Sequence, residues 1–329
     1  MAKAVKQHGR VYTPNYLVKI ILDFGNYSST RIISKHVIDN SCGDGAFLIE
    51  IVNRYCNEFF NTNSDISILK NHLETYIHGI ELDETEYNSC INNLNKTVKK
   101  YNLSNISWDI LNADTLTINK FNGNMDYVFG NHPYVRVHNL NNNYEAVKQY
   151  RFAEKGMTDL FIVFFEIGFN MLADNGTMCE ITPSSWLSSN AGIALRNYIT
   201  YHKNLSGLID LEHFQPFTAT TYTLISRFKK TQQSDKVEYY IFNQSTNREE
   251  FKDSISLKEM TINGQFYLSL RDNLATLQKI RTSYNYKYVS VKNGFATLAD
   301  KIFIGDFSFV EGTIEILKAS MRKTFLLLF

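Results

Sequence analysis

The residues best suited to chemistry lie in one short segment, residues 130–134, with the sequence G-N-H-P-Y. The segment follows an apolar run at residues 126–129 that is typical of a buried strand. The Asn131 side-chain oxygen and the main-chain carbonyl of His132, restrained by Pro133, offer two hydrogen-bond acceptors. Two acceptors against the N–H bonds of a ring-attached amino group release its lone pair, and Tyr134 offers a face for stacking a base. The segment therefore suits transfer of a group to an exocyclic amine; the alternative is an Asn/Pro turn with a packed Tyr.

A glycine-rich turn lies nearer the N-terminus, at residues 39–47, with the sequence D-N-S-C-G-D-G-A-F. Gly43 and Gly45 permit a tight turn and a close approach of the backbone to a ligand. The third glycine expected for a diphosphate cofactor is replaced by Leu48. Because Asp39 precedes the turn, the turn suits a ligand with a positive group, such as the amino and sulfonium groups of S-adenosylmethionine. A strand-to-helix turn without a ligand is the alternative.

Acidic residues also follow the second and third apolar runs. Glu81 ends the run at residues 76–82, where an acid can hold the two hydroxyls of a ribose. Glu81 lies further along the chain from the glycine turn than the ~20 residues that separate these two features in a compact nucleotide-binding unit. The Asn- and Ser-rich residues 57–67 predict an insertion between them. Asp114 follows the run at residues 106–111 and can accept a hydrogen bond from an adenine amino group. Each acid alone is also compatible with an ordinary surface position.

The elements that must position these residues alternate along the chain. Short apolar runs separated by amphipathic stretches predict βαβ units, hence an α/β fold with a doubly wound parallel sheet. In such a sheet ligands bind at the carboxyl ends of the strands, where the residues above fall. The expected strands cover residues 36–39, 76–82, 106–111, 126–129, 177–181, 205–211 and 221–228, and helices are expected at 46–60 and 160–172. After a polar linker at 232–235, a hairpin near 237–242 and a helix near 270–282 indicate a second domain.

The composition excludes several classes of protein. The 34 basic and 33 acidic residues give a net charge of +1, so a nucleic-acid partner would have to meet local basic stretches such as Lys229-Lys230 or Arg322-Lys323. None of the four cysteines forms a C-x-x-C pair, which argues against a disulfide framework and a metal cluster. The N-terminus lacks the apolar core of a signal peptide, and no apolar run is long enough to span a membrane. A cytoplasmic protein without a bound metal is expected.

Residues 130–140 (G-N-H-P-Y-V-R-V-H-N-L) resemble the catalytic motif of the gamma-class N6-adenine DNA methyltransferases of type IIG and IIS restriction–modification systems. In that family the tetrad is usually N-P-P-Y, so His132 is a departure. The likeness covers roughly residues 10–230 in the family's order and includes the stretches 12–18, 39–47, 79–83, 156–189 and 217–225, and it resumes at 294–304.

The resemblance implies a seven-stranded, Rossmann-like methyltransferase sheet in a catalytic domain of residues 1–234. Residues 235–329 would then form a small, partial target-recognition domain, and the apolar end of the chain would fit a truncated or split gene. The implied catalytic residues are Asn131, His132, Pro133 and Tyr134, with Tyr134 and Phe217 flanking the flipped base. The implied S-adenosylmethionine site comprises Thr13, Asp39, Ser41, Cys42, Gly43, Glu81, Leu82, Asp114, Asn131 and Phe164. Thr13, Asp39 and Ser41 would line the methionine end, Glu81 would hold the ribose, and Asp114 and Phe164 would contact the adenine.

The function expected from these observations is site-specific methylation of adenine N6 (EC 2.1.1.72) in double-stranded DNA. The enzyme would be the modification part of a restriction–modification system, without a nuclease domain in this chain and with the option of a separate specificity or restriction subunit. Two alternatives remain. A methyltransferase of the same fold can act on RNA, protein glutamine or cytosine N4, and a degenerate chain can persist as an inactive DNA-binding remnant.

Overall fold

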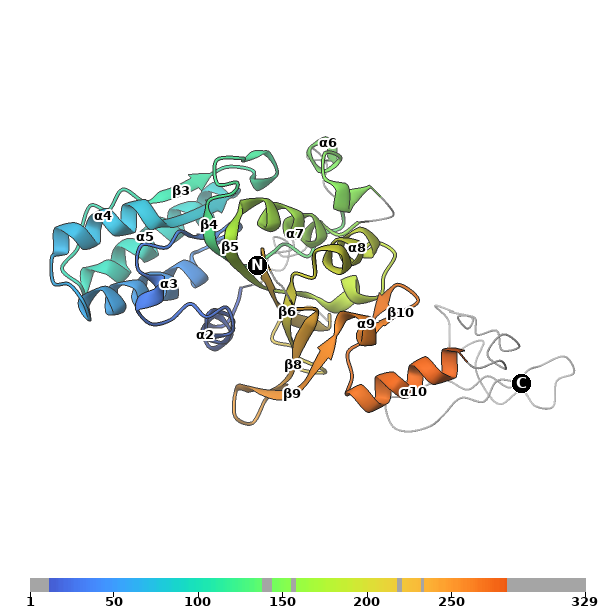
Figure 1. Ribbon diagram of the computed structural model, residues 1–329. Helices are drawn as coiled ribbons and strands as arrows, with labels where there is room; N and C mark the ends of the chain where they lie inside the picture. The colour runs from blue at the N-terminus through green and yellow to red at the C-terminus, as the bar shows by residue number, and fades with distance from the viewer. Residues whose placement is uncertain (1–11, 138–143, 155–157, 218–220, 232–233, 283–329) are drawn as a thin grey trace, which may run out of the picture. The chain divides into compact units, whose positions relative to one another are not determined.

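The computed structural model describes residues 12–137, 144–154, 158–217, 221–231 and 234–282. A nine-stranded sheet runs through this part of the chain in the order β3-β2-β1-β4-β5-β7-β6-β8-β9 (Figure 1). Pairing is parallel from β3 to β5 and between β6 and β8, and antiparallel on both sides of β7 and between β8 and β9. The strands are β1 (Val37–Asp39), β2 (Ile77–Glu81), β3 (Asp109–Asn112), β4 (Met125–Asn131), β5 (Leu172–Pro183), β6 (Leu205–Asp210), β7 (Thr223–Lys229), β8 (Lys236–Asn243) and β9 (Arg248–Ser256).

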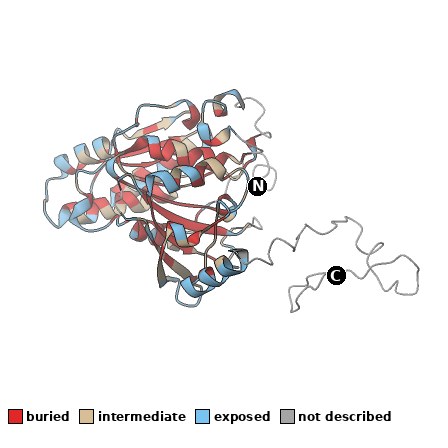
Figure 2. Cartoon of the chain, turned by 45° about the vertical axis from the view of Figure 1, so that its right-hand side comes forward, coloured by how far each residue is buried: buried red, intermediate tan, exposed pale blue. Residues whose placement is uncertain are grey.

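Helices cover both faces of this sheet. Val128 and Phe129 are adjacent in β4 and therefore point to opposite faces, and they belong to different hydrophobic clusters. The Val128 cluster includes α7 (Leu160–Met171) and α8 (Ile193–His202), and the Phe129 cluster includes α2 (Asn15–Phe24), α3 (Ala46–Phe60), α4 (Ile66–Tyr76) and α5 (Glu84–Lys99). Buried residues accordingly run along the strands and the inward sides of the helices (Figure 2). The predicted doubly wound α/β sheet is confirmed, but the expected seven strands become nine, because β8 and β9 extend the sheet beyond β6.

The connection between β1 and β2 is longer than a single helix. After α3 the chain forms α4, whose first turn is capped by Asp65 through hydrogen bonds from the Ser67 and Ile68 N–H groups. Only Leu69 and Leu73 of α4 are buried, so its apolar face is narrow. The excess length at residues 57–67 is thus the end of α3, a short turn and the start of α4.

The chain after residue 234 begins within the same sheet. Strand β8 pairs in parallel with β6, and β9 follows as the outer strand. Then come α9 (Leu257–Met260), the small pair β10 (Thr261–Ile262) and β11 (Gln265–Phe266), and α10 (Arg271–Thr282). The compact unit that contains the sheet runs from Met1 to Lys279. The stretch 294–304, Arg322-Lys323 and the apolar end of the chain lie outside the described residues, and the assignment of residues 235–329 to target recognition stays a prediction.

No helix in the described ranges combines the length and the apolar composition needed to cross a membrane. The four cysteines are all buried and all in the reduced, unpaired form.

Candidate active site

The strand ends that carry the predicted site residues meet at one edge of the sheet. Strand β1 lies between β2 and β4 and is parallel to both, with Asp39 in register with Gly79 on one side and Phe129 on the other. The carboxyl ends of β1, β2 and β4, at Asp39, Glu81 and Asn131, therefore lie side by side. Parallel sheets place ligand sites at this edge.

The glycine turn after β1 is held by the acid after β2. Gly43 has a φ of +54°, in the left-handed region, and a Cβ added there would meet nothing within 4 Å. The Gly43 N–H donates a hydrogen bond of 2.8 Å to Glu81 Oε2, and the Asp83 N–H donates one of 2.8 Å to Glu81 Oε1. Both carboxylate oxygens of Glu81 thus hold the turn in place. The space next to the Gly43 α-carbon is open.

Asp39 brings a buried carboxylate to the same turn. Its side chain is 2% exposed, and Oδ1 accepts a hydrogen bond of 3.1 Å from the Ser41 N–H. Burial raises the pKa of the Asp39 carboxyl to about 7, and the Ser41 hydrogen bond and the nearby His132 offset only part of that rise. A positive group placed beside this carboxylate would favour its ionised form.

Asn131, the first residue of the tetrad, is tied to the N-terminal segment. Its Nδ2 donates a hydrogen bond of 3.1 Å to Thr13 Oγ1. Thr13 is 8% exposed and directly precedes Pro14, whose carbonyl accepts hydrogen bonds from the first turn of α2. The contact orients the Asn131 amide, with its nitrogen toward Thr13, and brings together two motifs that lie 118 residues apart.

His132 turns its ring into the protein. The residue as a whole is 1% exposed, its Nδ1 lies 3.1 Å from Ser41 Oγ, and its ring stacks on Phe164 with centroids 4.7 Å apart. The glycine before the tetrad makes room for it, because a Cβ on Gly130 would lie 2.9 Å from His132 Cε1 and 3.3 Å from Asp39 Oδ1.

Glu180 of β5 was not among the predicted site residues. Its side chain is 0% exposed, and Oε1 lies 2.8 Å from His132 Nε2. Among the described residues, neither Glu180 oxygen accepts a hydrogen bond of good geometry, so this short approach to the His132 ring is its nearest polar contact. The available signal was an acidic residue inside the apolar run T-M-C-E-I, because a carboxylate is rarely buried without a partner.

The two aromatic residues expected at the target base are neighbours. The ring centroids of Tyr134 and Phe217 are 6.2 Å apart at 76°, an edge-to-face contact, and Tyr134 also contacts Phe161 at 6.4 Å. Both Tyr134 and Phe217 are partly exposed. Burial of the hydroxyl, which finds no hydrogen-bond partner among the described residues, raises the pKa of Tyr134 far above its usual range. The structure thus brings together the two predicted stacking faces.

The other predicted cofactor residues differ in their surroundings. Leu82 is 59% exposed after β2, whereas Cys42 is 4% exposed, with Sγ 4.0 Å from Cys90 Sγ. Asp114 Oδ1 accepts a hydrogen bond of 3.0 Å from the Leu116 N–H at the start of a short 3-10 helix. Phe164 is 5% exposed and packed in the core against His132, so its assignment to the cofactor adenine stays a prediction, as do the roles of the other three.

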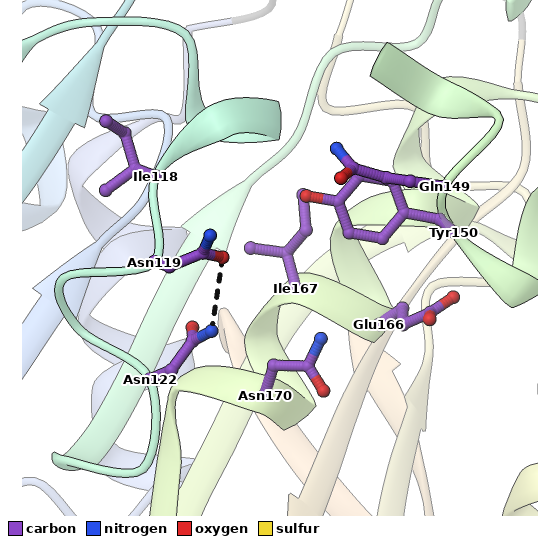
Figure 3. A pocket seen from close by; sticks show the side chains of 8 residues that line it. All are labelled: Ile118, Asn119, Asn122, Gln149, Tyr150, Glu166, Ile167 and Asn170. Atoms are coloured by element: carbon purple, nitrogen blue, oxygen red, sulfur yellow. Dashed lines mark hydrogen bonds between the residues drawn. The ribbon is translucent and has the colours of Figure 1, made fainter. Parts of the chain in front are cut away.

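A small pocket lies apart from this edge, between α7 and the segment that follows β3 (Figure 3). It contains none of the predicted site residues, and its lining is mostly polar: Ile118, Asn119, Asn122, Gln149, Tyr150, Glu166, Ile167 and Asn170. Within the described ranges no group of three or more His, Cys, Asp or Glu side chains is arranged to hold a metal ion.

Comparison with proteins of known structure shows the same fold. A Listeria monocytogenes protein assigned to class I of the S-adenosylmethionine-dependent methyltransferases superposes with a TM-score of 0.52 at 15% identity, over 69% of this chain and 65% of that one. The type ISP restriction–modification enzyme LlaGI, solved with a DNA substrate mimic, gives a TM-score of 0.57 at 17% identity, over 82% of this chain and 25% of that one. The sheet is therefore of the class I methyltransferase type.

Sequence comparison identifies the family. The type II methyltransferase M.BstVI of Geobacillus stearothermophilus is 30% identical over 229 residues, 64% of this chain and 40% of the relative. The chain spans between 28% and 57% of the lengths of four curated relatives that it matches. The family model described as Eco57I restriction-modification methylase matches residues 44–217, more than half of the chain. The chain belongs to the Eco57I restriction-modification methylase family.

Proposed function

We propose that this chain carries the catalytic domain of a site-specific DNA methyltransferase that transfers a methyl group from S-adenosylmethionine to adenine N6. The observation that carries the proposal is the placement of Asn131. Its amide is oriented by Thr13, and it lies at the same sheet edge as the Asp39 carboxylate and the Glu81-held turn. A target amine and a methyl donor bound at this edge would be neighbours.

The residues at the turn fit S-adenosylmethionine. The open space at Gly43 admits a ligand close to the backbone, and the buried Asp39 carboxylate lacks a close positive partner that outweighs its desolvation. Asp39 and Thr13 would hold the methionine end, Glu81 the ribose, and Leu82, Asp114 and Phe164 the adenine. When bound, the cofactor supplies an electrophilic methyl group on a sulfonium centre.

The tetrad would prepare the acceptor nitrogen. Asn131 Oδ1 and the His132 main-chain carbonyl accept hydrogen bonds from the two amino protons of the target base, which favours a tetrahedral nitrogen with an available lone pair. The extra proton on the methylated nitrogen leaves to solvent. No side chain needs to act as a general base, and the His132 ring lies inside the protein, away from such a role.

DNA is the substrate best supported by the neighbours of this fold, one of which was solved with a DNA substrate mimic. A base inside a duplex must be flipped out to reach such a site, at a cost of a few kcal/mol, and Tyr134 and Phe217 would stack on it. The restriction–modification methylase family supports a role in such a system, in which the enzyme would act on DNA in the cytoplasm with a separate specificity or restriction chain as a further partner.

The test is methyl transfer from radiolabelled S-adenosylmethionine to amplified genomic DNA, which carries no methylated bases. Cellular RNA and a release-factor protein serve as competing acceptors. We expect label in DNA and N6-methyladenine in its nucleoside digest, and none with Asn131→Ala, whose cofactor binding is checked by calorimetry. Label in RNA, protein or N4-methylcytosine would replace the adenine assignment, and absence of both cofactor binding and transfer would favour the inactive remnant.

A further inference from the structure

A buried pair of ionisable side chains lies beneath the tetrad. The side chains of His132 and Glu180 are both 0% exposed, and Nε2 of the histidine is 2.8 Å from Oε1 of the glutamate. Glu180 in β5 stands opposite Gly130 of β4, the residue before the tetrad. Burying a carboxylate is strongly unfavourable unless a partner offsets the lost hydration. In the described part of the chain, neither Glu180 oxygen accepts a well-directed hydrogen bond, so the close His132 ring supplies the main compensation.

The His132 ring is held from several sides. Nε2 faces Glu180, Nδ1 lies 3.1 Å from Ser41 Oγ, and one face stacks on Phe164 at 4.7 Å and 22°. The absence of a Cβ at Gly130 lets the ring fold back against the preceding backbone. A ring fixed in this way restricts the χ angles of His132 and, through Cα, the orientation of its peptide groups.

This restriction bears on the proposed reaction, because the main-chain carbonyl of His132 is the second acceptor for the target amine. A proline in this position would restrain φ by its own ring, whereas histidine leaves φ free. We infer that Glu180 is a positioning residue: it anchors the His132 ring in the core and thereby holds the His132 carbonyl in place where the tetrad lacks a proline. The inference rests on the proposed methyl transfer.

The same anchor links the tetrad to the cofactor turn. Ser41 Oγ lies 3.1 Å from His132 Nδ1 and 3.5 Å from the Asn131 main-chain oxygen, and the Ser41 N–H donates to Asp39. Loss of Glu180 would release the ring and, with it, the contact between Ser41 and the tetrad. The expected defect is therefore in the transfer step, more than in cofactor binding at Asp39 and Glu81.

The experiment is a double-mutant cycle with the full chain. Glu180→Leu replaces the buried acid by an apolar side chain of similar size, Glu180→Gln keeps a polar group there, and His132→Pro removes the ring. Each variant is compared with the double variant Glu180→Leu/His132→Pro in single-turnover methyl transfer to amplified genomic DNA. Calorimetry gives the Kd for S-adenosylmethionine, and hydrogen exchange reports the amides of Asn131, His132 and Tyr134.

We expect Glu180→Leu to slow methyl transfer by about 10- to 100-fold, as a small misplacement of a reacting group does, with little change in the cofactor Kd. Exchange at the tetrad amides should accelerate, and Glu180→Gln should lie between wild type and Leu. His132→Pro alone leaves Glu180 buried without its partner and should lower the urea midpoint of unfolding. The double variant has neither a buried carboxyl group nor a free φ at residue 132, so it should recover most of the rate lost in Glu180→Leu.

Asp109→Asn is the matched control. Asp109 Oδ2 lies 2.8 Å from His78 Nδ1, the same kind of pair at the amino ends of β2 and β3, at the opposite edge of the sheet. Asp109→Asn should lower the urea midpoint of unfolding without changing hydrogen exchange at the tetrad amides or the rate of methyl transfer. Wild-type exchange and transfer in Glu180→Leu, or a double variant no faster than Glu180→Leu, would overturn the inference. If the wild-type chain methylates no DNA, the proposed function fails, whereas exchange and unfolding still decide whether Glu180 anchors the tetrad.

Discussion

Thr13 Oγ1 accepts a hydrogen bond of 3.1 Å from Asn131 Nδ2, so a residue at the start of the described chain orients the amide at the end of β4. The contact distinguishes the two ends of the amide: the nitrogen is directed to Thr13, and the oxygen is the end that the proposed mechanism assigns to the target amine. Thr13 therefore contacts the tetrad in addition to its predicted place at the cofactor.

Thr13→Val should slow methyl transfer by about 2- to 12-fold, because it removes one neutral hydrogen bond while preserving the shape of the side chain. The single-turnover rate with labelled S-adenosylmethionine measures the effect. Thr13→Ser keeps the hydroxyl and is the control. Equal rates for the Val and Ser variants would show that Thr13 does not orient Asn131.

Asp39 predicts a pH dependence of cofactor binding. Burial raises the pKa of Asp39 to about 7, so the carboxyl is largely protonated below that pH and has no charge to offer a cation. Affinity for S-adenosylmethionine should rise by up to tenfold per unit between about pH 5 and 7 and then level off. Calorimetry across this range tests it. Asp39→Asn should bind more weakly and without this slope, and a parallel slope in the variant would assign the titration to another group.

The raised pKa of Asp39 also makes the stability of the fold depend on pH, but stability falls as the pH rises, whereas cofactor affinity increases. Because the folded pKa of Asp39 lies above its ordinary value of 3.8, its contribution to stability is present below that value and is lost as the pH rises through about 7. Asp39→Asn should therefore be more stable than wild type at pH 8, by roughly 2–4 kcal/mol, and the difference should shrink toward pH 4. Urea unfolding at the two pH values measures it, and a less stable variant at pH 8 would contradict the burial argument.

Glu81 should affect both the turn and the cofactor. Its two oxygens accept hydrogen bonds from the Gly43 and Asp83 N–H groups, so Glu81→Ala releases the turn as well as the predicted ribose contact. We expect the cofactor Kd to rise by an amount corresponding to roughly 1.5–3 kcal/mol, with faster hydrogen exchange at Gly43 and Asp83. Glu84→Ala removes an exposed acid three residues further along and is the control. Equal Kd values in the two variants would remove Glu81 from the site.

Much of the fold could be predicted because its strands are short apolar runs that end at chemically distinctive residues. The helix α4 could not, since an Asn- and Ser-rich stretch precedes it and only two of its residues, Leu69 and Leu73, are buried. The pairing of β8 with β6 could not be predicted either, because a hairpin pattern in the sequence does not reveal which strand of a sheet it will join.

The candidate site, like the fold, could be predicted from the sequence only in part. Residues within one motif, such as Asn131 and Tyr134, are recognisable because their chemistry is local to the segment. The His132–Glu180 contact depends on the β4–β5 register, which places Glu180 beside Gly130, and no local pattern specifies that register. For Phe164 the sequence allowed two interpretations, because an aromatic residue in F-I-V-F-F suits both a core position and a binding face. In the structure Phe164 packs against His132.

The contact between Tyr134 and Phe217 predicts how the enzyme would treat base pairing. Flipping a paired adenine costs a few kcal/mol, and stacking on an aromatic face returns roughly 1–3 kcal/mol per base. Tyr134→Ala/Phe217→Ala should therefore lower transfer to a paired adenine more than transfer to an adenine opposite an abasic site, where less unpairing is needed. Single-turnover rates on the two duplexes give the ratio.

A 2-aminopurine at the target position provides an independent signal, because its fluorescence increases when it leaves the base stack and decreases when it stacks on an aromatic ring. The rings now meet edge to face at 6.2 Å, so a base that stacks on either must displace this contact, and the double variant should alter the fluorescence change on DNA binding. Phe251→Ala, which removes an aromatic 58% exposed on the outer strand β9, is the control and should leave rates and fluorescence unchanged. The contrary outcome is an equal slowing of transfer on both duplexes together with wild-type fluorescence. It would show that Tyr134 and Phe217 only pack the edge of the core, because loss of a residue that holds the flipped base must slow transfer most on the duplex that is harder to unpair.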